Sequence, residues 1–223
     1  MENKKVDRTV HKNGLLRGLL KKEVLLLRPF VREPWKDFTL TQIKQITGNT
    51  SHHYAYNGLE RFVSSGVIAK ATKGNTNLYK IRADGGQSSL YLCIMEMIMR
   101  EERKDIPYGN IARLMVKIRS PFYSLLVGGS YAEGKQKKGS DLDVAIIIPD
   151  GESKKQHEIA LKEGELMVPE IHGFVFTQEE FHLMLTNPEF NYGKEIARKH
   201  VMIHGSEAYY SMLFRAMRNG FTG

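Results

Sequence analysis

The segment from Phe122 to Ile148 constrains the fold more than any other part of the chain. It reads FYSLLV, then Gly-Gly-Ser, then a lysine-rich stretch, and finally Asp-Leu-Asp followed by VAIII. Both apolar runs are short and aliphatic, which is typical of buried strands. The glycines between them allow the backbone to turn sharply. The sequence therefore predicts a sheet in the second half of the chain.

Two acids stand one residue apart at the start of the second run. In a strand, residues two apart project from the same face, so the carboxylates of Asp141 and Asp143 are predicted to point the same way. Leu142 and Val144 then point into the core. Adjacent carboxylates repel each other unless a cation lies between them, and hard oxygen ligands at this separation suit Mg²⁺. A solvated strand start is the alternative for an isolated Asp-x-Asp.

The glycine turn follows the first run directly. Glycine lets a ligand approach the main chain closely, and Ser130 is predicted to cap a helix that starts near Tyr131. The free N–H groups at such a helix start attract anionic phosphate oxygens. The turn and the acids together indicate a site for a phosphate-bearing substrate with a divalent cation.

These residues resemble the signature of the DNA polymerase beta superfamily of nucleotidyltransferases. The resemblance is closest to the minimal nucleotidyltransferases, whose pattern is Gly-Ser-x-Ala-x-Gly, a variable stretch, and Ser-Asp-x-Asp. It covers roughly residues 121 to 180. The matching positions are Gly129, Ser130, Ala132, Gly134, Ser140, Asp141 and Asp143.

The resemblance implies a role for each matching position. Gly129 and Ser130 would hold the β and γ phosphates of a nucleoside triphosphate, and Asp141 and Asp143 would bind Mg²⁺. The family usually adds a third carboxylate on a later strand, which completes a second metal site and helps to deprotonate the attacking hydroxyl. In the strand predicted at 167–177, Glu170 is the only acid, so it is the predicted third catalytic and metal-binding residue. If Glu170 points into solvent, two-metal transfer is in doubt.

Residues 24–82 have the order helix, turn, helix, hairpin. Thr39 is the predicted N-cap of a helix that Gly48 ends, and Ser51 caps a second helix that ends at Gly66. Two β-compatible segments around a Gly-Asn turn follow. This order resembles a winged helix-turn-helix, a family that has no short diagnostic motif.

The winged-helix resemblance implies that residues 51–64 enter the major groove of DNA and that the hairpin lysines approach its phosphates. The only charged residues of that helix are Glu60 and Arg61, so base contacts would fall to polar side chains. Winged helices also dock proteins, and that alternative stays open. A homodimer is compatible with the family. The predicted DNA-binding residues are Ser51, His52, His53, Tyr56, Asn57, Lys70 and Lys73.

Basic residues are concentrated in the front half of the chain. Residues 1–120 carry 22 Lys and Arg against 11 Asp and Glu, whereas residues 121–223 carry 11 against 14. A basic front half suits a polyanion such as double-stranded DNA, and a basic surface without a partner is the alternative. No apolar run is long enough for a membrane span or a signal peptide, so the sequence predicts a cytoplasmic protein without membrane contact.

The sequence thus predicts an α+β protein in three parts. A winged helix-turn-helix domain with a basic N-terminal arm occupies 1–86, connecting helices occupy 87–120, and a nucleotidyltransferase domain with a mixed sheet flanked by helices occupies 121–223. The first connecting helix is expected to be capped by Ser88 or Ser89. Its predicted apolar stripe is Leu90, Cys93, Ile94, Met97 and Ile98. In the final helix, Tyr209 and Tyr210 either line the substrate pocket or pack in the core.

The predicted function is Mg²⁺-dependent transfer of a nucleoside monophosphate from a nucleoside triphosphate such as ATP to an acceptor hydroxyl. The alternative is a DNA-binding transcriptional regulator whose nucleotidyltransferase-like domain is inactive and serves as a sensor or partner-binding surface. A third hypothesis, by analogy alone, is an antitoxin-like protein that modifies or masks a protein partner.

Overall fold

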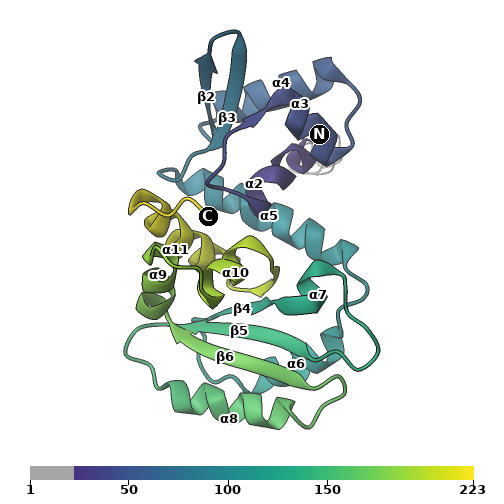
Figure 1. Ribbon diagram of the computed structural model, residues 1–223, viewed down its shortest axis with the longest axis vertical. Coiled ribbons are helices and arrows are strands. Elements are labelled where there is room, and N and C mark those ends of the chain that lie inside the picture. The colour runs from purple at the N-terminus through teal and green to yellow at the C-terminus, as the bar shows by residue number, and fades with distance from the viewer. Residues whose placement is uncertain (1–22) are drawn as a thin grey trace, which may run out of the picture.

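The computed structural model describes residues 23–223, so the basic arm predicted within residues 1–22 lies outside the described residues. Figure 1 shows helices and a hairpin at the top, a second sheet with its helices below, and helix α5 between the two. We call the upper part, residues 24–81, the N-terminal unit and the lower part, residues 108–218, the C-terminal unit.

The N-terminal unit packs short helices against an antiparallel sheet of order β1-β3-β2. The Thr39 hydroxyl accepts the Gln42 N–H at the start of α3, and the Ser51 hydroxyl accepts the Tyr54 N–H at the start of α4, both at 3.2 Å. Both predicted caps, the end of α3 at Gly48 and the hairpin are confirmed. The elements are η1 (Val24–Leu27), α2 (Arg28–Arg32), β1 (Phe38–Thr39), α3 (Leu40–Thr47), α4 (His52–Ser64), β2 (Ile68–Lys73) and β3 (Thr76–Ile81).

One long helix, α5 (Gly86–Glu102), packs against both units. The predicted cap by Ser88 or Ser89 is wrong, because the helix begins at Gly86. Ser88 is buried inside the first turn, where its hydroxyl donates to the Val67 carbonyl at 3.1 Å. Residues 83–89, which are rich in Gly and Ser, are therefore partly helical, and the Ser88 hydrogen bond links α5 to the N-terminal unit.

The predicted apolar stripe of α5 is right only in part, because Cys93, Ile94 and Ile98 pack against the core and the other two members do not. Leu90 and Met97 are exposed, whereas Leu92, Met95 and Glu96 are buried. Elements of the N-terminal unit contact one side of α5, and α11 and β7 contact it as well. The buried positions are therefore set by two packing partners and not by the helix's own pattern of apolar residues.

The C-terminal unit holds a mixed sheet of order β6-β5-β4-β7, in which β5 and β6 run parallel and the other pairs run antiparallel. This confirms a mixed sheet flanked by helices. Its strands are β4 (Ser124–Val127), β5 (Leu142–Ile148), β6 (Ile171–Thr177) and β7 (Val201–His204). Its helices are α6 (Tyr108–Lys117), α7 (Gly129–Glu133), α8 (Lys154–Gly164), α9 (Gln178–Thr186), α10 (Tyr192–Arg198) and α11 (Ser206–Arg218).

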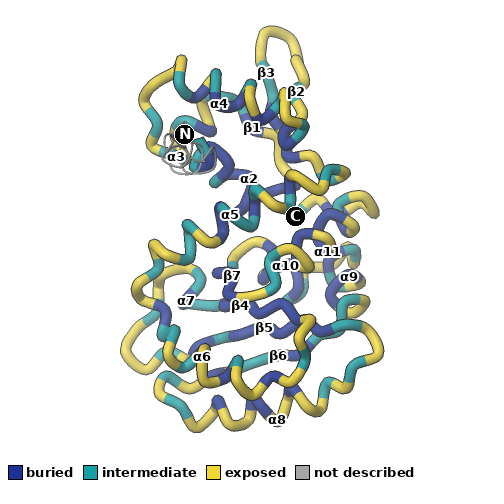
Figure 2. Tube along the Cα trace, turned by 180° about the vertical axis from the view of Figure 1, so that it is seen from behind, coloured by how far each residue is buried: buried dark blue, intermediate teal, exposed yellow. Residues whose placement is uncertain are grey.

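The two faces of this sheet belong to different cores. Alternate residues of β5 divide between them: Val144 and Ile146 join a cluster with α6 and α8, whereas Ala145 and Ile147 join a cluster with α9, α10 and α11. The second cluster continues through α5 into the N-terminal unit. Figure 2 shows this band of buried residues running between the two units. The units therefore share one apolar core.

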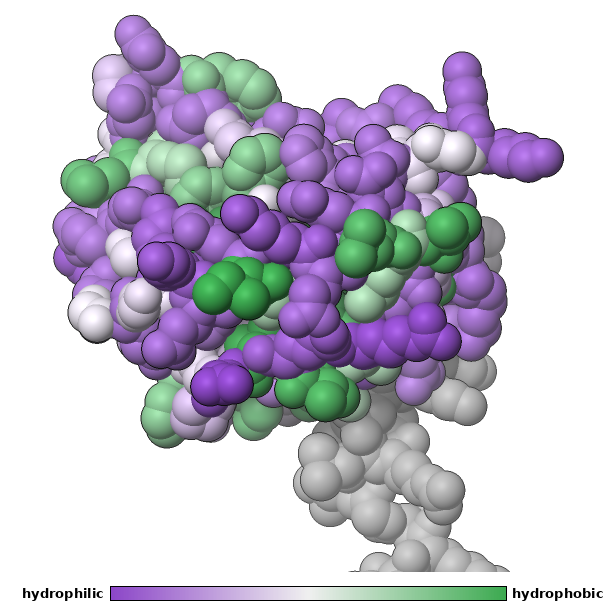
Figure 3. Space-filling view, turned by 90° about the horizontal axis from the view of Figure 1, so that it is seen from below, coloured by the Kyte–Doolittle hydropathy of each residue, from purple (hydrophilic) through white to green (hydrophobic). Residues whose placement is uncertain are grey.

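The terminal helix packs in that shared core. Tyr209 and Tyr210 are fully buried, so the packing alternative for these tyrosines is confirmed. Seen from below, the surface is largely polar with separate apolar patches (Figure 3). No helix within residues 23–223 is long and apolar enough to cross a membrane.

Candidate functional site

The glycine turn and the second acid are in direct contact. Because β4 runs antiparallel to β5, Val127 pairs with Val144, and the Gly128 N–H donates to the Asp143 carbonyl at 2.9 Å. Gly129 has φ of +56°, and a Cβ atom at this position would lie 1.8 Å from Asp143 Oδ2. Only glycine fits both this backbone and this space. The turn and the Asp143 carboxylate therefore form one structure.

Helix α7 begins two residues earlier than the sequence predicts. Ser130 was predicted to be its N-cap, but α7 starts at Gly129 with Gly128 as the N-cap, and no side chain caps it. The positive φ of Gly129 turns the chain before Ser130 is reached. Ser130 lies in the first turn of the helix and is half-buried. Gly129 and Ser130, the predicted phosphate-binding pair, are therefore the first two residues of α7, and the predicted cap by Ser130 is wrong.

An arginine outside the motif fixes the other end of α7. Arg103 Nη1 donates to the Ala132 carbonyl at 2.9 Å, and Nη2 donates to the Tyr131 carbonyl. Asp105 accepts from Arg103 Nε and Nη2 at 2.9 and 2.7 Å, and this bond lowers the pKa of Asp105. No local sequence pattern indicates this role, because Arg103 precedes its partners by 28 and 29 residues.

Of the two acids, Asp143 lies within β5, as the sequence predicts, whereas Asp141 lies one residue before the strand begins. Asp141 is exposed just before β5, while Asp143 is half-buried within it, and Leu142 is fully buried between them. Burial raises the pKa of Asp143; nearby His172 opposes this, and the charge of Asp141 adds to it. Within residues 23–223 no hydrogen bond reaches the Asp143 carboxylate, and His172 Nδ1 lies 3.8 Å from Oδ1. Its oxygens are thus available to a ligand.

The neighbouring strand brings a histidine to this carboxylate. In the parallel pair, Asp143 is in register with His172. Glu170 comes just before β6, where its carbonyl accepts the Leu142 N–H at 2.8 Å while its side chain is exposed. Among the residues that the structure describes, no group of three His, Cys, Asp or Glu side chains is placed to hold a metal ion. Glu170 as the third ligand therefore stays a prediction.

Aromatic rings continue the face that carries Asp143. Phe174 follows His172 on the same side of β6, with ring centroids 5.4 Å apart, and the Tyr192 ring of α10 lies 4.8 Å from Phe174. The Tyr192 hydroxyl is buried without a partner in the described part of the chain, and burial, then Asp143, raises its pKa. Because side chains alternate between the two faces of a strand, the sequence alone places Phe174 on the same face as His172, whereas no local pattern places Tyr192 there.

The predicted DNA-binding residues gather at the start of α4 and on the hairpin. Ser51, His52, His53 and Tyr56 are exposed. His52 stacks on Tyr56 with ring centroids 6.4 Å apart. Asn57 is half-buried, and its side-chain amide lies 2.9 Å from the His53 ring. This end of α4 is a polar, solvent-facing surface.

The two predicted hairpin lysines differ. Lys73 is exposed next to the hairpin turn. Lys70 Nζ instead donates to Glu60 Oε1 at 2.7 Å, and this hydrogen bond raises the pKa of Lys70. Its charge is therefore already balanced within the unit, whereas that of Lys73 faces solvent.

Residues 112–200 match the family model of the nucleotidyltransferase domain. The match runs from within α6 to the end of α10 and contains the glycine turn, both strand acids and Glu170. No curated protein and no solved structure matches the chain. Residues 112–200 are thus similar to a nucleotidyltransferase domain, and this similarity supports a transferase role with a nucleotide as substrate.

Proposed function

We propose that this protein is a Mg²⁺-dependent nucleotidyltransferase that moves a nucleoside monophosphate from a nucleoside triphosphate to an acceptor hydroxyl. The observation that carries the proposal is the contact between Gly129 and the Asp143 carboxylate. A triphosphate resting on the turn of Gly129 and Ser130 would lie next to Asp143 of β5, and Asp141 comes just before that strand. Asp141, Asp143 and the turn all lie inside the matched segment.

The residues present fit a magnesium ion. Asp141 and Asp143 offer carboxylate oxygens, which Mg²⁺ prefers, and no donor from the described residues occupies those of Asp143. The repulsion between the two acids, which helps to raise the pKa of Asp143, is the feature that a cation relieves. When bound, the ion would supply positive charge to the phosphates and to the developing negative charge of the transfer.

The chain's own groups hold the reactants in line. The acceptor oxygen forms a bond to the α phosphorus, the bond from that phosphorus to the β-phosphate oxygen breaks, and pyrophosphate leaves with the electron pair. The acceptor proton passes to a side chain on the same face, and Glu170 and His172 are the candidates. The exposed ring of Phe174 and the ring of Tyr192 offer an apolar wall on which a nucleobase or an aromatic acceptor stacks.

We further propose that the N-terminal unit is a winged helix that binds double-stranded DNA or docks a protein. Three helices followed by a hairpin, with the strand order β1-β3-β2, support this proposal. The exposed start of α4 would supply groove contacts, and Lys73 would approach a phosphate. Because Lys70 is bound to Glu60, we assign it a smaller role in DNA binding than Lys73.

A second candidate function is a DNA-binding regulator with an inactive transferase-like unit. The exposed position of Glu170 and the absence, within residues 23–223, of a three-residue metal cluster favour it. In that case the protein binds DNA, as a homodimer or with a protein partner, and transfers nothing.

The test is to incubate the purified full chain with Mg²⁺ and each of the four labelled triphosphates, together with cell extract as the source of acceptor. We expect label transfer and pyrophosphate release, both lost in Asp141→Asn. His172→Gln and Glu170→Gln, measured side by side, identify the residue that accepts the proton, because only its loss lowers the rate steeply. Salt-sensitive DNA binding with no transfer to any acceptor would favour the second candidate instead.

A further inference from the structure

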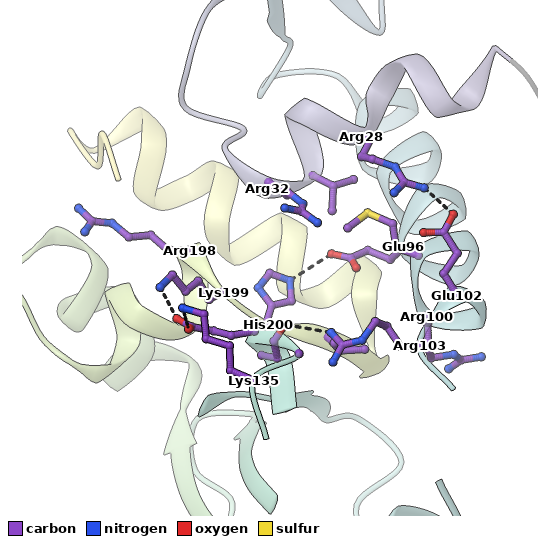
Figure 4. Close-up of a pocket in the computed structure, with 16 residues that line it drawn as sticks. Arg28, Arg32, Glu96, Arg100, Glu102, Arg103, Lys135, Arg198, Lys199 and His200 are labelled. Atoms are coloured by element: carbon purple, nitrogen blue, oxygen red, sulfur yellow. Dashed lines mark hydrogen bonds and ion pairs between the residues drawn. The ribbon is translucent and has the colours of Figure 1, made fainter. Parts of the chain in front are cut away.

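A basic cleft lies between the two units, away from the acids of β5. It encloses about 430 Å³ and is lined by α2, the end of α5, the end of α7 and the connection from α10 to β7 (Figure 4). None of Gly129, Ser130, Asp141 and Asp143 lines it. Seven of its lining residues are Lys or Arg and three are Glu, so the cavity is cationic. Ala132 and Gly134 line it where α7 ends, so it borders the glycine motif without containing the residues proposed to bind phosphate and metal.

The three glutamates of the basic cleft are already bound. Glu102 pairs with Arg28 at 2.5 Å. Glu133 pairs with both Lys135 and Lys199, and these lysines hold its pKa at about 2. One carboxylate thus serves two ammonium groups, so the lysine pair retains an excess positive charge. Within residues 23–223, no carboxylate pairs with Arg32, whose guanidinium points into the cleft in Figure 4.

The floor of the basic cleft is a buried hydrogen-bonded network. Glu96 is 3% exposed, and its Oε1 accepts from the Tyr210 hydroxyl at 2.9 Å and lies 3.1 Å from His200 Nε2. His200 Nδ1 is bonded to the Ile196 carbonyl at 2.8 Å. These hydrogen bonds hold Glu96 of α5 and His200, which follows α10, together beneath the cleft.

Those walls come from different parts of the chain. Arg28 and Arg32 belong to α2 of the N-terminal unit, whereas Lys135 and Lys199 belong to the C-terminal unit. Like charges brought together in this way repel, and an anion between them removes the repulsion. Guanidinium and ammonium groups bind phosphate oxygens through short charge-assisted hydrogen bonds.

We infer that the basic cleft binds a phosphate-bearing small anion of nucleotide size, held between Arg32 and the lysines at 135 and 199. The cavity falls within the roughly 300–1,000 Å³ typical of small-ligand sites. The ligand would tie α2 to the loop that follows α10, so its binding would couple the N-terminal unit to the transferase unit. This inference goes beyond the proposed function and does not require transfer activity.

The experiment separates this cleft from the acids of β5. Binding of ATP and of inorganic pyrophosphate is measured by calorimetry at low salt, with EDTA present, in the full chain carrying Asp141→Asn and Asp143→Asn. We expect one site per chain for each probe. Adding Arg32→Ala and Lys199→Ala should weaken binding at least tenfold, because two charge-assisted contacts are lost. Adding Lys155→Ala and Lys162→Ala, on exposed positions of α8, removes the same charge and should change affinity less than twofold.

Two outcomes would overturn the inference: no binding of either probe, whether or not a single-stranded oligonucleotide binds, or equal affinity in the two pairs of variants. Arg32 and Lys199 are both exposed, so the folded state should survive their loss, which thermal unfolding checks. If the double variant is nevertheless unstable, Arg32→Glu alone should also weaken binding of both probes, because it replaces a positive charge with a negative one. Failure of the proposed transfer reaction leaves this result unaffected, since the strand acids are already removed.

Discussion

Gly129→Ala tests the contact between the turn and the strand acid. The added Cβ would lie 1.8 Å from Asp143 Oδ2 and 2.8 Å from Cγ, whereas ordinary contacts begin at 3.4 Å. The carboxylate must therefore move by about 1.5 Å, and a misplacement of about 1 Å at a reacting centre lowers rates by roughly 100-fold. A non-glycine residue at this φ of +56° also costs about 1–2 kcal/mol in unfolding free energy. We expect Mg²⁺-dependent pyrophosphate release to fall at least ~100-fold.

Gly48→Ala is the matched control for backbone strain. Gly48 has a similar φ of +66°, and no atom lies within 4 Å of its would-be Cβ. Both variants should lose roughly 2–8 °C in Tm, but only Gly129→Ala should lose transfer. Transfer by Gly129→Ala within a few-fold of the unsubstituted protein, at the same loss of Tm, would refute the idea that this contact builds the site.

Four further predictions follow from individual contacts. Asp143→Asn should abolish transfer without lowering the Tm in EDTA. Because burial raises the folded-state pKa of Asp143, its ionisation costs stability as pH rises from about 3.8 through the folded pKa. The Tm of the unsubstituted protein should therefore fall relative to that of the variant across this range, and the opposite slope would contradict the assignment. Arg103→Ala should lower kcat and destabilise the chain by about 1–3 kcal/mol in urea unfolding, with partial rescue by Arg103→Lys, since the carbonyls at the end of α7 lose their donor. Glu96→Ala should cost about 3 kcal/mol, because two buried partners are left unpaired, and an unchanged urea midpoint would show that the network is not intact. If the N-terminal unit binds DNA, Lys73→Ala should reduce the logarithmic salt slope of binding by about 1, while Lys70→Ala should change it less; equal effects would show that Lys70 leaves its carboxylate on binding.

The sequence predicted those features that depend on local chemistry. The caps at Thr39 and Ser51 and the hairpin depend on neighbouring residues alone, and each formed where expected. The placement of Asp141 and Asp143 at the start of a buried strand was equally readable, because the aliphatic run that follows them is a local pattern.

Features set by distant packing could not be read in this way. The buried positions of α5 follow from contact with both units, and the predicted stripe missed Leu92 and Met95. His172 lies beside Asp143 through the register of two parallel strands, which no local pattern fixes. Arg103 and Tyr192 reach the turn and the acid from elements far away in the chain. The basic cleft likewise forms only where the two units meet.

The most direct test of the central claim is a crystal structure with Mn²⁺ and a non-hydrolysable nucleoside triphosphate. We expect an anomalous peak from Mn²⁺ within about 2.2 Å of oxygens of Asp141 and Asp143, a distance typical of carboxylate ligands of such ions. The β and γ phosphates should lie on the turn of Gly129 and Ser130. A nucleotide bound only in the basic cleft, with no metal at the two acids, would contradict the claim.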